Sequence, residues 1–412
     1  MQRDARAVRP PARTTMILLM GLGLIAVLTA GAFAIFGAGV RGAPPEKLDE
    51  AEALEKISST PENAPDFRAT VTVEQTIVPE GLISASEGDG PGASGPRSAR
   101  VWYGGPDKLR AELQGENGDR VFVQNGPEIN VYDGAANTVR TGEKPESGAP
   151  SPEEAASPEE INELLAEISP TSDLRTGPPV EVAGRWAYPL TLEPKDRRLT
   201  LVERAEAFVD AETFVPLSFE LYAEDAPEPV ARYEARDFEV GPVPERRFEF
   251  EAPPGAEVLP EETGDGKGRG KDHGSRVDEP RKVDSVDEAR EVAGFPVRGL
   301  ADPVGSRELR EIRVAGDGVM LAYGEGWGNV VLAEKPGQED GTPPEASDEE
   351  GAVADSGFEV LTVDLGAGVE AREISTPVGS TLSWSADGIS YSLSGSVPAV
   401  ELREAARGLL AR

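Results

Sequence analysis

The longest apolar stretch of this 412-residue chain lies near its N-terminus. Met16–Val40 comprises 25 consecutive residues without a charge, more than the ~20 that a helix needs to cross a bilayer. Four Arg and one Asp precede it, and such a basic flank predicts that residues 1–15 stay in the cytoplasm. We therefore expect a single-pass anchor in the cell membrane over residues 16–40, with the bulk of the chain extracytoplasmic. A cleaved signal peptide stays open as the alternative, although its apolar core normally spans only ~7–15 residues.

After this stretch, a short helical pattern gives way to a period of two. Apolar residues at helical spacing predict a helix from Leu48 that ends before Pro61. Phe67–Ile77 then alternates apolar and polar residues, as expected for an antiparallel strand with one buried face. A meander of short strands with tight turns follows, and the polar stretches 79–98 and 142–156 are predicted to be loops. The meander strands are predicted at 99–103, 108–113, 120–124, 129–132 and 138–141.

The clearest helix start in the sequence is Ser157-Pro158-Glu159-Glu160, which combines an N-cap hydroxyl, a first-turn Pro and a Glu three residues after the Ser. An apolar stripe follows as far as Ile168, so we expect this helix to lie across a sheet. Further strands are predicted at 186–192, 199–210, 214–222, 230–240 and 246–251, with a turn at 210–213. About ten strands before Pro254 are too many for a flat sheet, which predicts a sheet that curls or closes.

The segment 261–282 is predicted to be a flexible linker, because it holds five Gly, charges of both signs and a single aliphatic residue. The pattern therefore divides the chain into a basic tail (1–15), the anchor (16–40), a β domain (46–260), the linker (261–282) and a smaller α+β domain (283–412). In the last part we predict a short helix after Asp284 or Ser285, a closing helix at 399–410 and an acidic loop at 337–356. Its strands are predicted at 311–314, 319–323, 329–332, 358–363, 371–375, 381–385 and 389–394.

The charge of the chain excludes one class of partner. The net charge is −34, and residues 1–40 are positively charged, so the remainder is more acidic still. Nucleic acids are bound by Lys and Arg that displace counterions from phosphates, and we therefore expect no nucleic-acid partner. A soluble, highly hydrated surface is the simpler interpretation of this charge.

The residues of common active sites are scarce. The chain has no Cys, and its single His, His273, lies in the predicted linker, so Ser-His-Asp, Cys-His and zinc sites lack their parts. Gly324–Gly328 lacks the Lys and the helix of a phosphate loop and is predicted to be a turn. The acidic run 348–350 lacks the ligand spacing of a calcium loop. We predict no enzyme, no metal and no cofactor; a glycosidase with two carboxylates is the enzymatic alternative.

Several features of the layout are shared with a known superfamily. They are the leading helix, the strand from Asp66-Phe67, the hairpin around Asn125-Gly126, the stretch Val209-Asp210 to Val215-Pro216-Leu217, and the closing Phe248-Glu249-Phe250 and Pro253-Pro254-Gly255-Ala256. In these features residues 48–259 resemble the superfamily that contains LolA, LppX and the N-terminal domain of MucB/RseB. The last part, with Trp384, Gly388-Ile389-Ser390-Tyr391 and a final helix, is similar to an uncharacterised family of bacterial envelope domains and to the C-terminal domain of MucB/RseB.

This resemblance implies a mainly β (α+β) fold: a curved, partly open antiparallel half-barrel covered by helices, followed by a smaller α+β domain. In several members of the superfamily the cavity accepts acyl chains, and MucB/RseB regulates an anti-sigma factor. We therefore expect a membrane-anchored, extracytoplasmic binding protein whose partners are the membrane, a lipid or lipoprotein acyl chain, and a membrane regulator such as an anti-sigma factor. The anchor argues against a shuttle, because a tethered carrier cannot cross a periplasm.

The resemblance also gives candidate residues for an apolar cavity. They are Phe67, Val71, Val73, Leu190, Leu192, Leu217 and Phe219. The alternative is that these side chains form an ordinary sheet core, which would fit a protein-binding or structural envelope module without a lipid ligand.

Overall fold

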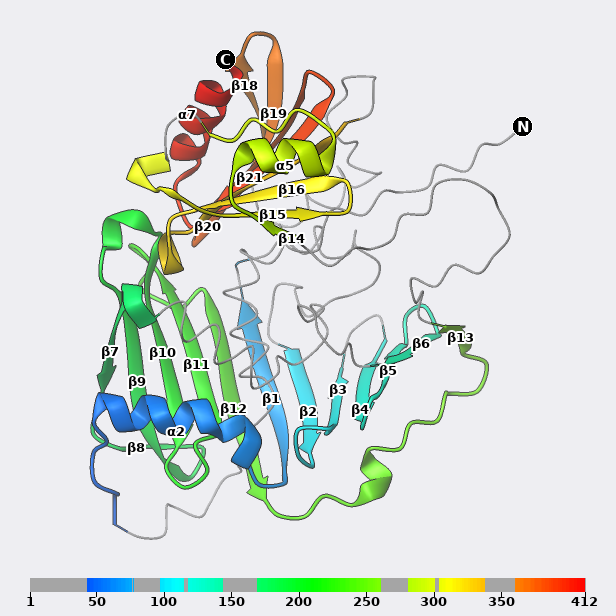
Figure 1. Ribbon diagram of the computed structural model, residues 1–412. Coiled ribbons are helices and arrows are strands. Elements are labelled where there is room, and N and C mark those ends of the chain that lie inside the picture. Colours follow the sequence, from blue (N-terminus) through cyan, green and yellow to red (C-terminus); the bar gives the residue numbers. More distant parts are fainter. Residues whose placement is uncertain are drawn as a thin grey trace.

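The computed structural model of the chain describes residues 43–75, 77, 97–114, 118–143, 169–260, 281–300, 304–337 and 360–411. The predicted anchor, the predicted helix at 157–168 and His273 lie outside these residues. So do the linker up to residue 280 and nearly all of the loops predicted at 79–98, 142–156 and 337–356. Two sheets, one on each side of the linker, make up most of the described chain (Figure 1). The expectation of a mainly β protein with few helices and open sheets is confirmed.

The first sheet has 13 strands in the order β13-β6-β5-β4-β3-β2-β1-β12-β11-β10-β9-β7, with β8 paired to β9. All its pairs are antiparallel except β13 with β6. The helix α2 (Glu50–Asn63) lies across the β7–β12 half (Figure 1). The strands are β1 (Phe67–Gln75), β2 (Arg97–Tyr103), β3 (Lys108–Leu113), β4 (Arg120–Asn125), β5 (Glu128–Asp133), β6 (Thr138–Glu143), β7 (Ser172–Thr176), β8 (Val180–Val182), β9 (Arg185–Pro194), β10 (Val202–Asp210), β11 (Pro216–Ala223), β12 (Ala231–Val240) and β13 (Glu257–Pro260).

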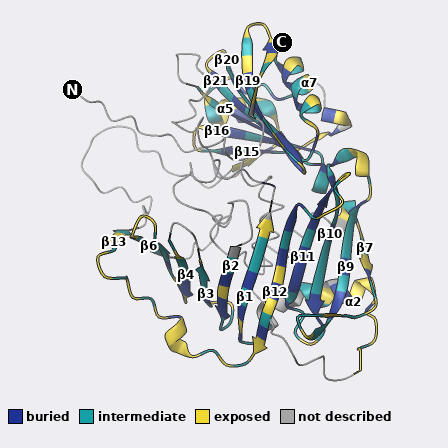
Figure 2. Ribbon diagram, turned by 180° about the vertical axis from the view of Figure 1, so that it is seen from behind, coloured by how far each residue is buried: buried dark blue, intermediate teal, exposed yellow. Residues whose placement is uncertain are grey.

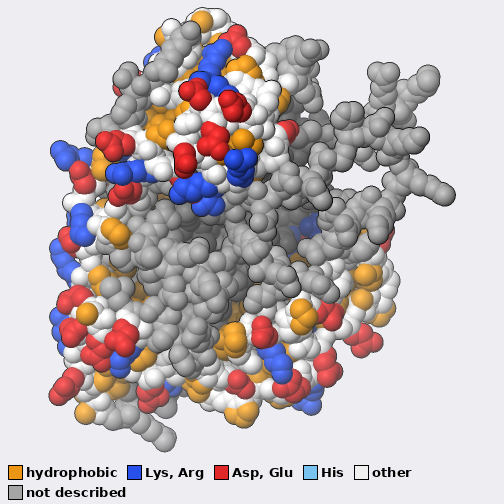
Figure 3. All heavy atoms as spheres, viewed as in Figure 1, with side chains coloured by type: hydrophobic (Ala, Val, Ile, Leu, Met, Phe, Trp, Pro, Cys, Tyr) orange, Lys and Arg blue, Asp and Glu red, His pale blue; other side chains and the backbone are white. Residues whose placement is uncertain are grey.

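The two faces of the first sheet differ in polarity. Alternate residues of the strands build one buried apolar cluster, and Figure 2 shows how burial follows the strands. The opposite face carries ion pairs between neighbouring strands, such as Arg100–Glu112 at 2.9 Å and Arg232–Glu220 at 2.8 Å. Charges of both signs are interspersed over the surface visible in Figure 3. Exposed pairs of this kind contribute only about 0–1 kcal/mol each, so the apolar face holds the sheet together.

The second sheet has eight strands in the order β14-β15-β16-β17-β21-β20-β19-β18, all antiparallel. The helices α5 (Val286–Ala293) and α7 (Ala399–Leu410) pack against it. Ser285 caps α5 by accepting the Glu288 N–H at 3.1 Å. The strands are β14 (Arg281–Val283), β15 (Leu309–Ala315), β16 (Gly318–Tyr323), β17 (Val330–Pro336), β18 (Val360–Gly366), β19 (Val369–Thr376), β20 (Gly379–Ala386) and β21 (Ile389–Gly395). We call the chain from Arg281 onward the second module.

The prediction of a strand at 246–251 is wrong. The structure has a short 3-10 helix there, η3 (Glu245–Arg247), followed by irregular chain. This segment lies on the charged face of the first sheet, where the guanidinium of Arg247 stacks over Trp102. Arg110 donates to the carbonyls of Arg247 and Glu249. Because the segment crosses a face and not an edge, no strand is available to pair with it.

Three smaller differences from the sequence predictions concern boundaries. The helix α2 runs through Pro61 to Asn63 and so extends past the predicted end. The short strands β7, β8 and β13 were not predicted. The strand β14 was not predicted either, and it includes Arg281 and Lys282, the last two residues of the predicted linker.

One buried carboxylate organises the core of the second module. Glu334, on β17, is 1% exposed and accepts the backbone N–H groups of Arg298 and Gly299 at 2.9 and 2.8 Å. Burial raises the pKa of this carboxyl, while the two N–H groups and the nearby charges of Arg298 and Arg290 oppose that rise. The neighbouring hydroxyl of Tyr391 has its pKa raised to about 12, chiefly by burial and then by the charge of Glu334.

Stability should therefore depend on pH through Glu334. A carboxyl whose folded-state pKa is raised contributes stability that is complete below its unfolded pKa of ~4.3 and is lost as the pH rises through the folded-state value. We expect the unfolding free energy of the wild type, relative to Glu334→Gln, to fall as the pH rises from about 4, by about 1.4 kcal/mol for each unit of pKa elevation. Urea unfolding at a series of pH values measures this difference. Curves that stay parallel over the whole range would contradict the prediction.

Candidate binding face and domain junction

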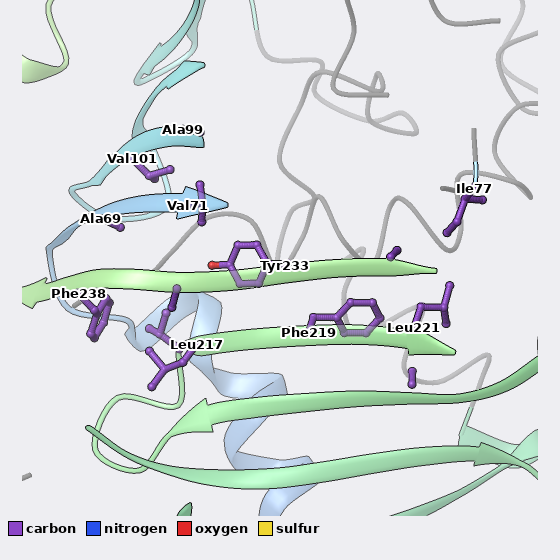
Figure 4. Close-up of a cluster of buried hydrophobic side chains, with 14 of the residues drawn as sticks. Ala69, Val71, Ile77, Ala99, Val101, Leu217, Phe219, Leu221, Tyr233 and Phe238 are labelled. Carbon is purple, nitrogen blue, oxygen red and sulfur yellow. The ribbon is translucent and has the colours of Figure 1, made fainter. Parts of the chain in front are cut away.

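The seven candidate residues of the predicted cavity all belong to the apolar face of the first sheet. Strand pairing places Val73, Tyr233, Phe219, Ala207 and Leu190 side by side across five neighbouring strands. We call this line of side chains the apolar row. All of it except Leu190 lies in one cluster with Val71 and Leu217, and Figure 4 shows part of that cluster. Phe67 continues the face and stacks on Tyr103, with ring centroids 5.1 Å apart. The alternation seen in the sequence has therefore brought these residues together.

Burial divides the candidates into two groups. Phe67, Val71, Leu190, Leu217 and Phe219 are at most 3% exposed. Val73 and Leu192 are half-buried at the margin of the same cluster. Side chains as buried as the first five are packed against other protein atoms, whereas the two half-buried ones retain free surface. A role in holding a ligand stays a prediction for all seven.

One end of the apolar face is covered by α2 and by the chain that leads into it. Leu48 and Ala53 pack with Tyr188, Leu190 and Val209 in a separate apolar cluster. The Thr176 hydroxyl, on β7, donates to the Leu48 carbonyl at 2.7 Å and fixes this contact. We call this the α2 end of the face.

The other end of the face meets the second module. Ser172 begins β7, and its hydroxyl oxygen accepts the indole N–H of Trp327 at 2.7 Å. Trp327 lies in the 3-10 helix η5 (Gly326–Gly328), between β16 and β17. Its ring packs against the apolar cluster of the first sheet, and Val378 of the second module is buried in that same cluster. The second module thus contributes apolar side chains to the first core.

Hydrogen bonds between the two sheets hold this junction together. The Leu201 N–H donates to the Ser396 carbonyl at 2.9 Å, and the hydroxyls of Thr200 and Ser396 lie 2.8 Å apart. These contacts use residues that the sequence placed in a strand starting at Leu199, whereas β10 begins at Val202 and Arg197–Leu199 forms the 3-10 helix η2. The chain leaves the sheet pattern here because it pairs with the second module.

A buried arginine completes the junction. Arg307 is 3% exposed, and its guanidinium donates to the carbonyls of Gly328, Val304 and Leu199 at 2.6, 2.7 and 2.8 Å. It also pairs with Glu401 at 3.2 Å. The Leu199 bond crosses from the second module to the first, so one side chain ties both together. Beside it lies a cavity of about 150 Å³ lined by Arg197, Arg198, Thr200, Leu201, Glu224, Pro398 and Glu401.

The glycines around Trp327 allow the close approach. Gly326 has a φ of +53°, and a side chain there would collide with the Thr171 hydroxyl of the short 3-10 helix η1 (Ser169–Thr171). A Cβ on Gly328 would lie 3.0 Å from the Cβ of Leu199. The sequence predicted a turn at Gly324–Gly328, which agrees with the structure, but it did not predict the contact. A Trp placed between two glycines in a turn was the signal that could have indicated it.

The described residues offer no obvious centre for metal chemistry, since no three His, Asp or Glu side chains among them are grouped as ligands. Several acids in the junction and on the sheet form ion pairs, among them Glu401 and Glu220. Asp210, for example, is 1% exposed and forms an ion pair with Arg185, and its carboxylate accepts the Thr213 N–H at 2.9 Å in the turn before β11.

Within the described part of the chain, no helix has the length and apolar character needed to cross a membrane. The stretch predicted to do so, residues 16–40, lies outside it.

Comparison with known proteins finds similarity in fold. No family model and no curated protein sequence matches the chain. The structure of the Pseudomonas aeruginosa MucA/MucB complex matches with 15% identity and a TM-score of 0.45, covering 87% of this chain and 97% of that one. An uncharacterised conserved protein from Thermus thermophilus matches with 15% identity and a TM-score of 0.32, covering 51% of this chain and 98% of that one. A LolA superfamily protein from Nitrosomonas europaea matches with 11% identity and a TM-score of 0.22, covering 49% and 98%. The chain is thus similar in fold, and in fold alone, to MucB and LolA-superfamily structures.

Proposed function

We propose that the protein is a membrane-anchored, extracytoplasmic binding protein whose apolar face receives the acyl chain of a lipid or lipoprotein. The observation that carries the proposal is the apolar row, which runs across five adjacent strands without a charged residue. Each methylene that moves from water into such a surface contributes about 0.8 kcal/mol. An acyl chain is long, flexible and purely apolar, and it needs no hydrogen-bonding partners from the protein.

The position of the predicted anchor supports a lipid as the occupant. The uncharged stretch ends at Val40, and Leu48 is already packed at the α2 end of the face. Eight residues of extended chain span at most about 28 Å. If residues 16–40 cross the membrane, the α2 end of the face is therefore held near the membrane surface, where acyl chains are available.

The regulatory form of this proposal adds a protein partner. Occupancy of the face would change the contact between this protein and a membrane protein such as an anti-sigma factor, and so report on the state of the envelope. The physical link would be the junction, because the second module packs on the same core as the apolar row.

One observation favours a different function. Five of the seven candidate residues are already at most 3% exposed, as they would be in a sheet whose face is filled by its own protein. On this alternative the protein is a protein-binding or structural module of the envelope and takes no lipid.

Native mass spectrometry of the extracytoplasmic part, residues 43–412, separates these functions. The protein is purified from cell envelopes, and its native mass is compared with its denatured mass. An added mass that matches a lipid and disappears on denaturation is the expected result. A mass without ligand, repeated after incubation with envelope lipids, would refute lipid binding and support the alternative.

A substitution at the margin of the apolar face should weaken lipid binding without unfolding the protein. Leu192 is half-buried, so Leu192→Asn removes apolar contact and places an amide where the acyl chain would lie. We expect at least about tenfold weaker binding of a fluorescent fatty acid, since the loss of two methylene equivalents has this effect.

Thr191→Asn is the matched control, because Thr191 is the neighbouring residue on the same strand, is also half-buried and points to the opposite face. It should leave the affinity within about twofold of the wild type, a difference of only ~0.4 kcal/mol. Equal effects of the two variants would contradict the assignment of the binding face.

A further inference from the structure

The second module forms one boundary of the apolar face. Strand β7 connects the α2 end of the apolar face with the junction. Its Thr176 hydroxyl donates to the Leu48 carbonyl at the α2 end, and its Ser172 hydroxyl accepts the Trp327 indole N–H at the junction. Leu174 lies midway and packs with the apolar residues at the α2 end. Four residues of strand span about 13 Å, so the face is bounded on this side by α2 at one end and by an indole ring at the other.

Trp327 is well placed to act as a wall. Its indole is half-buried, packs against the first core and is oriented by the hydrogen bond to Ser172. Gly326 and Gly328 let the turn that carries Trp327 approach Thr171 and Leu199 closely. Arg307 donates to the carbonyls of both Gly328 and Leu199 and so links the turn to the first module. A large, rigid ring supported in this way resists displacement by a flexible chain.

We infer that Trp327 closes the acyl-binding face at the junction and sets the longest acyl chain that the protein accepts. This inference rests on the proposed function and adds a residue that determines specificity. An acyl chain that crosses the apolar row as far as β9 and then follows this strand past the half-buried Leu192 reaches the junction, where its terminal methyl group meets the indole. Chains beyond that length leave methylenes in water and gain nothing further from burial.

The test is a series of saturated fatty acids of increasing chain length, measured by native mass spectrometry and by displacement of a fluorescent fatty acid. For the wild type, affinity should rise with length and then stop rising at a cutoff. Trp327→Ala should move this cutoff to longer chains, with about tenfold tighter binding of the first chain beyond it, the effect of about two more buried methylenes. Ser172→Ala, which only frees the indole, should shift the cutoff in the same direction by less.

Tyr132→Ala is the control for loss of an aromatic ring, because Tyr132 is half-buried on the opposite face of the first sheet. It should leave the cutoff unchanged. If Trp327→Ala fails to fold by circular dichroism, Trp327→Phe provides a smaller ring without the indole N–H and should give a smaller shift. A cutoff that is the same in the wild type and in the folded Trp327 variants would overturn this inference while leaving the proposed function intact. A wild type that binds no fatty acid of any length would overturn the proposed function itself.

Discussion

Replacing Arg307 by Met should lower the free energy of unfolding by about 3–5 kcal/mol, because three carbonyls inside the protein lose a hydrogen-bond donor and each such loss costs about 1–3 kcal/mol. The guanidinium is buried and bonds to three carbonyls and to Glu401. Met fills a similar volume but donates no hydrogen bond, so the carbonyls of Gly328, Val304 and Leu199 lose these donors inside the protein. The junction should weaken first, because Arg307 carries a hydrogen bond from the second module to the Leu199 carbonyl.

Two measurements check this result. Urea unfolding gives the change in stability, and hydrogen exchange of the Leu201 amide, which bonds to the Ser396 carbonyl, reports on the junction alone. The exchange should accelerate in Arg307→Met. Arg310→Met is the control, since the Arg310 side chain is 52% exposed and pairs with Glu325 at the surface, where such pairs contribute about 0–1 kcal/mol. Equal losses in the two variants would show that the junction does not depend on Arg307.

Much of the local structure could be predicted because it depends on residues that are close together in the sequence. The strand β3 at 108–113 and the last helix at 399–410 have the predicted boundaries. In both, the alternation or the stripe of apolar residues is regular and the ends are marked by turn residues or Pro. The short helix predicted after Asp284 or Ser285 follows from apolar residues at helical spacing, and in the structure the Ser285 hydroxyl caps its first turn.

What could not be predicted depends on residues far apart in the sequence. The segment at 246–251 has the alternation of a strand, but Arg110 and Trp102, more than 130 positions earlier, hold it across a face of the sheet. The contact between Trp327 and Ser172 joins positions 155 residues apart. Nothing in the sequence around Trp327 indicates which surface the indole meets, because that surface exists only once the first sheet has formed.

The candidate site shows the same division. The alternation of apolar residues placed Val71, Leu217 and the others on one face, and the structure agrees. Periodicity does not distinguish a side chain in the core from one that a ligand could reach, because both point the same way. That distinction comes from exposure, which separates Leu217 from Val73 and Leu192.

Leu217→Ala should therefore act on stability, with a loss of about 3–5 kcal/mol in the free energy of unfolding. Leu217 has 0% exposure on β11, near the centre of the first core, and Leu→Ala changes at such sites lose both the burial of the side chain and the packing around the cavity left behind. Leu217→Asp should abolish folding of the first sheet, because the free-energy cost of burying an unpaired carboxylate is comparable to the whole unfolding free energy of a typical domain. Urea unfolding and far-UV circular dichroism measure both effects.

Leu192→Ala is the matched control, since it removes the same atoms from the same face at a half-buried position. It should cost only about 1–2 kcal/mol, because less surface is buried there. Loss of lipid uptake in Leu217→Asp would then reflect loss of the fold, whereas loss of uptake in a folded variant at Leu192 would reflect the binding face. If Leu217→Asp folds normally, Leu217 faces an open space that a charge can share with water, and the division between core and accessible residues would have to be redrawn.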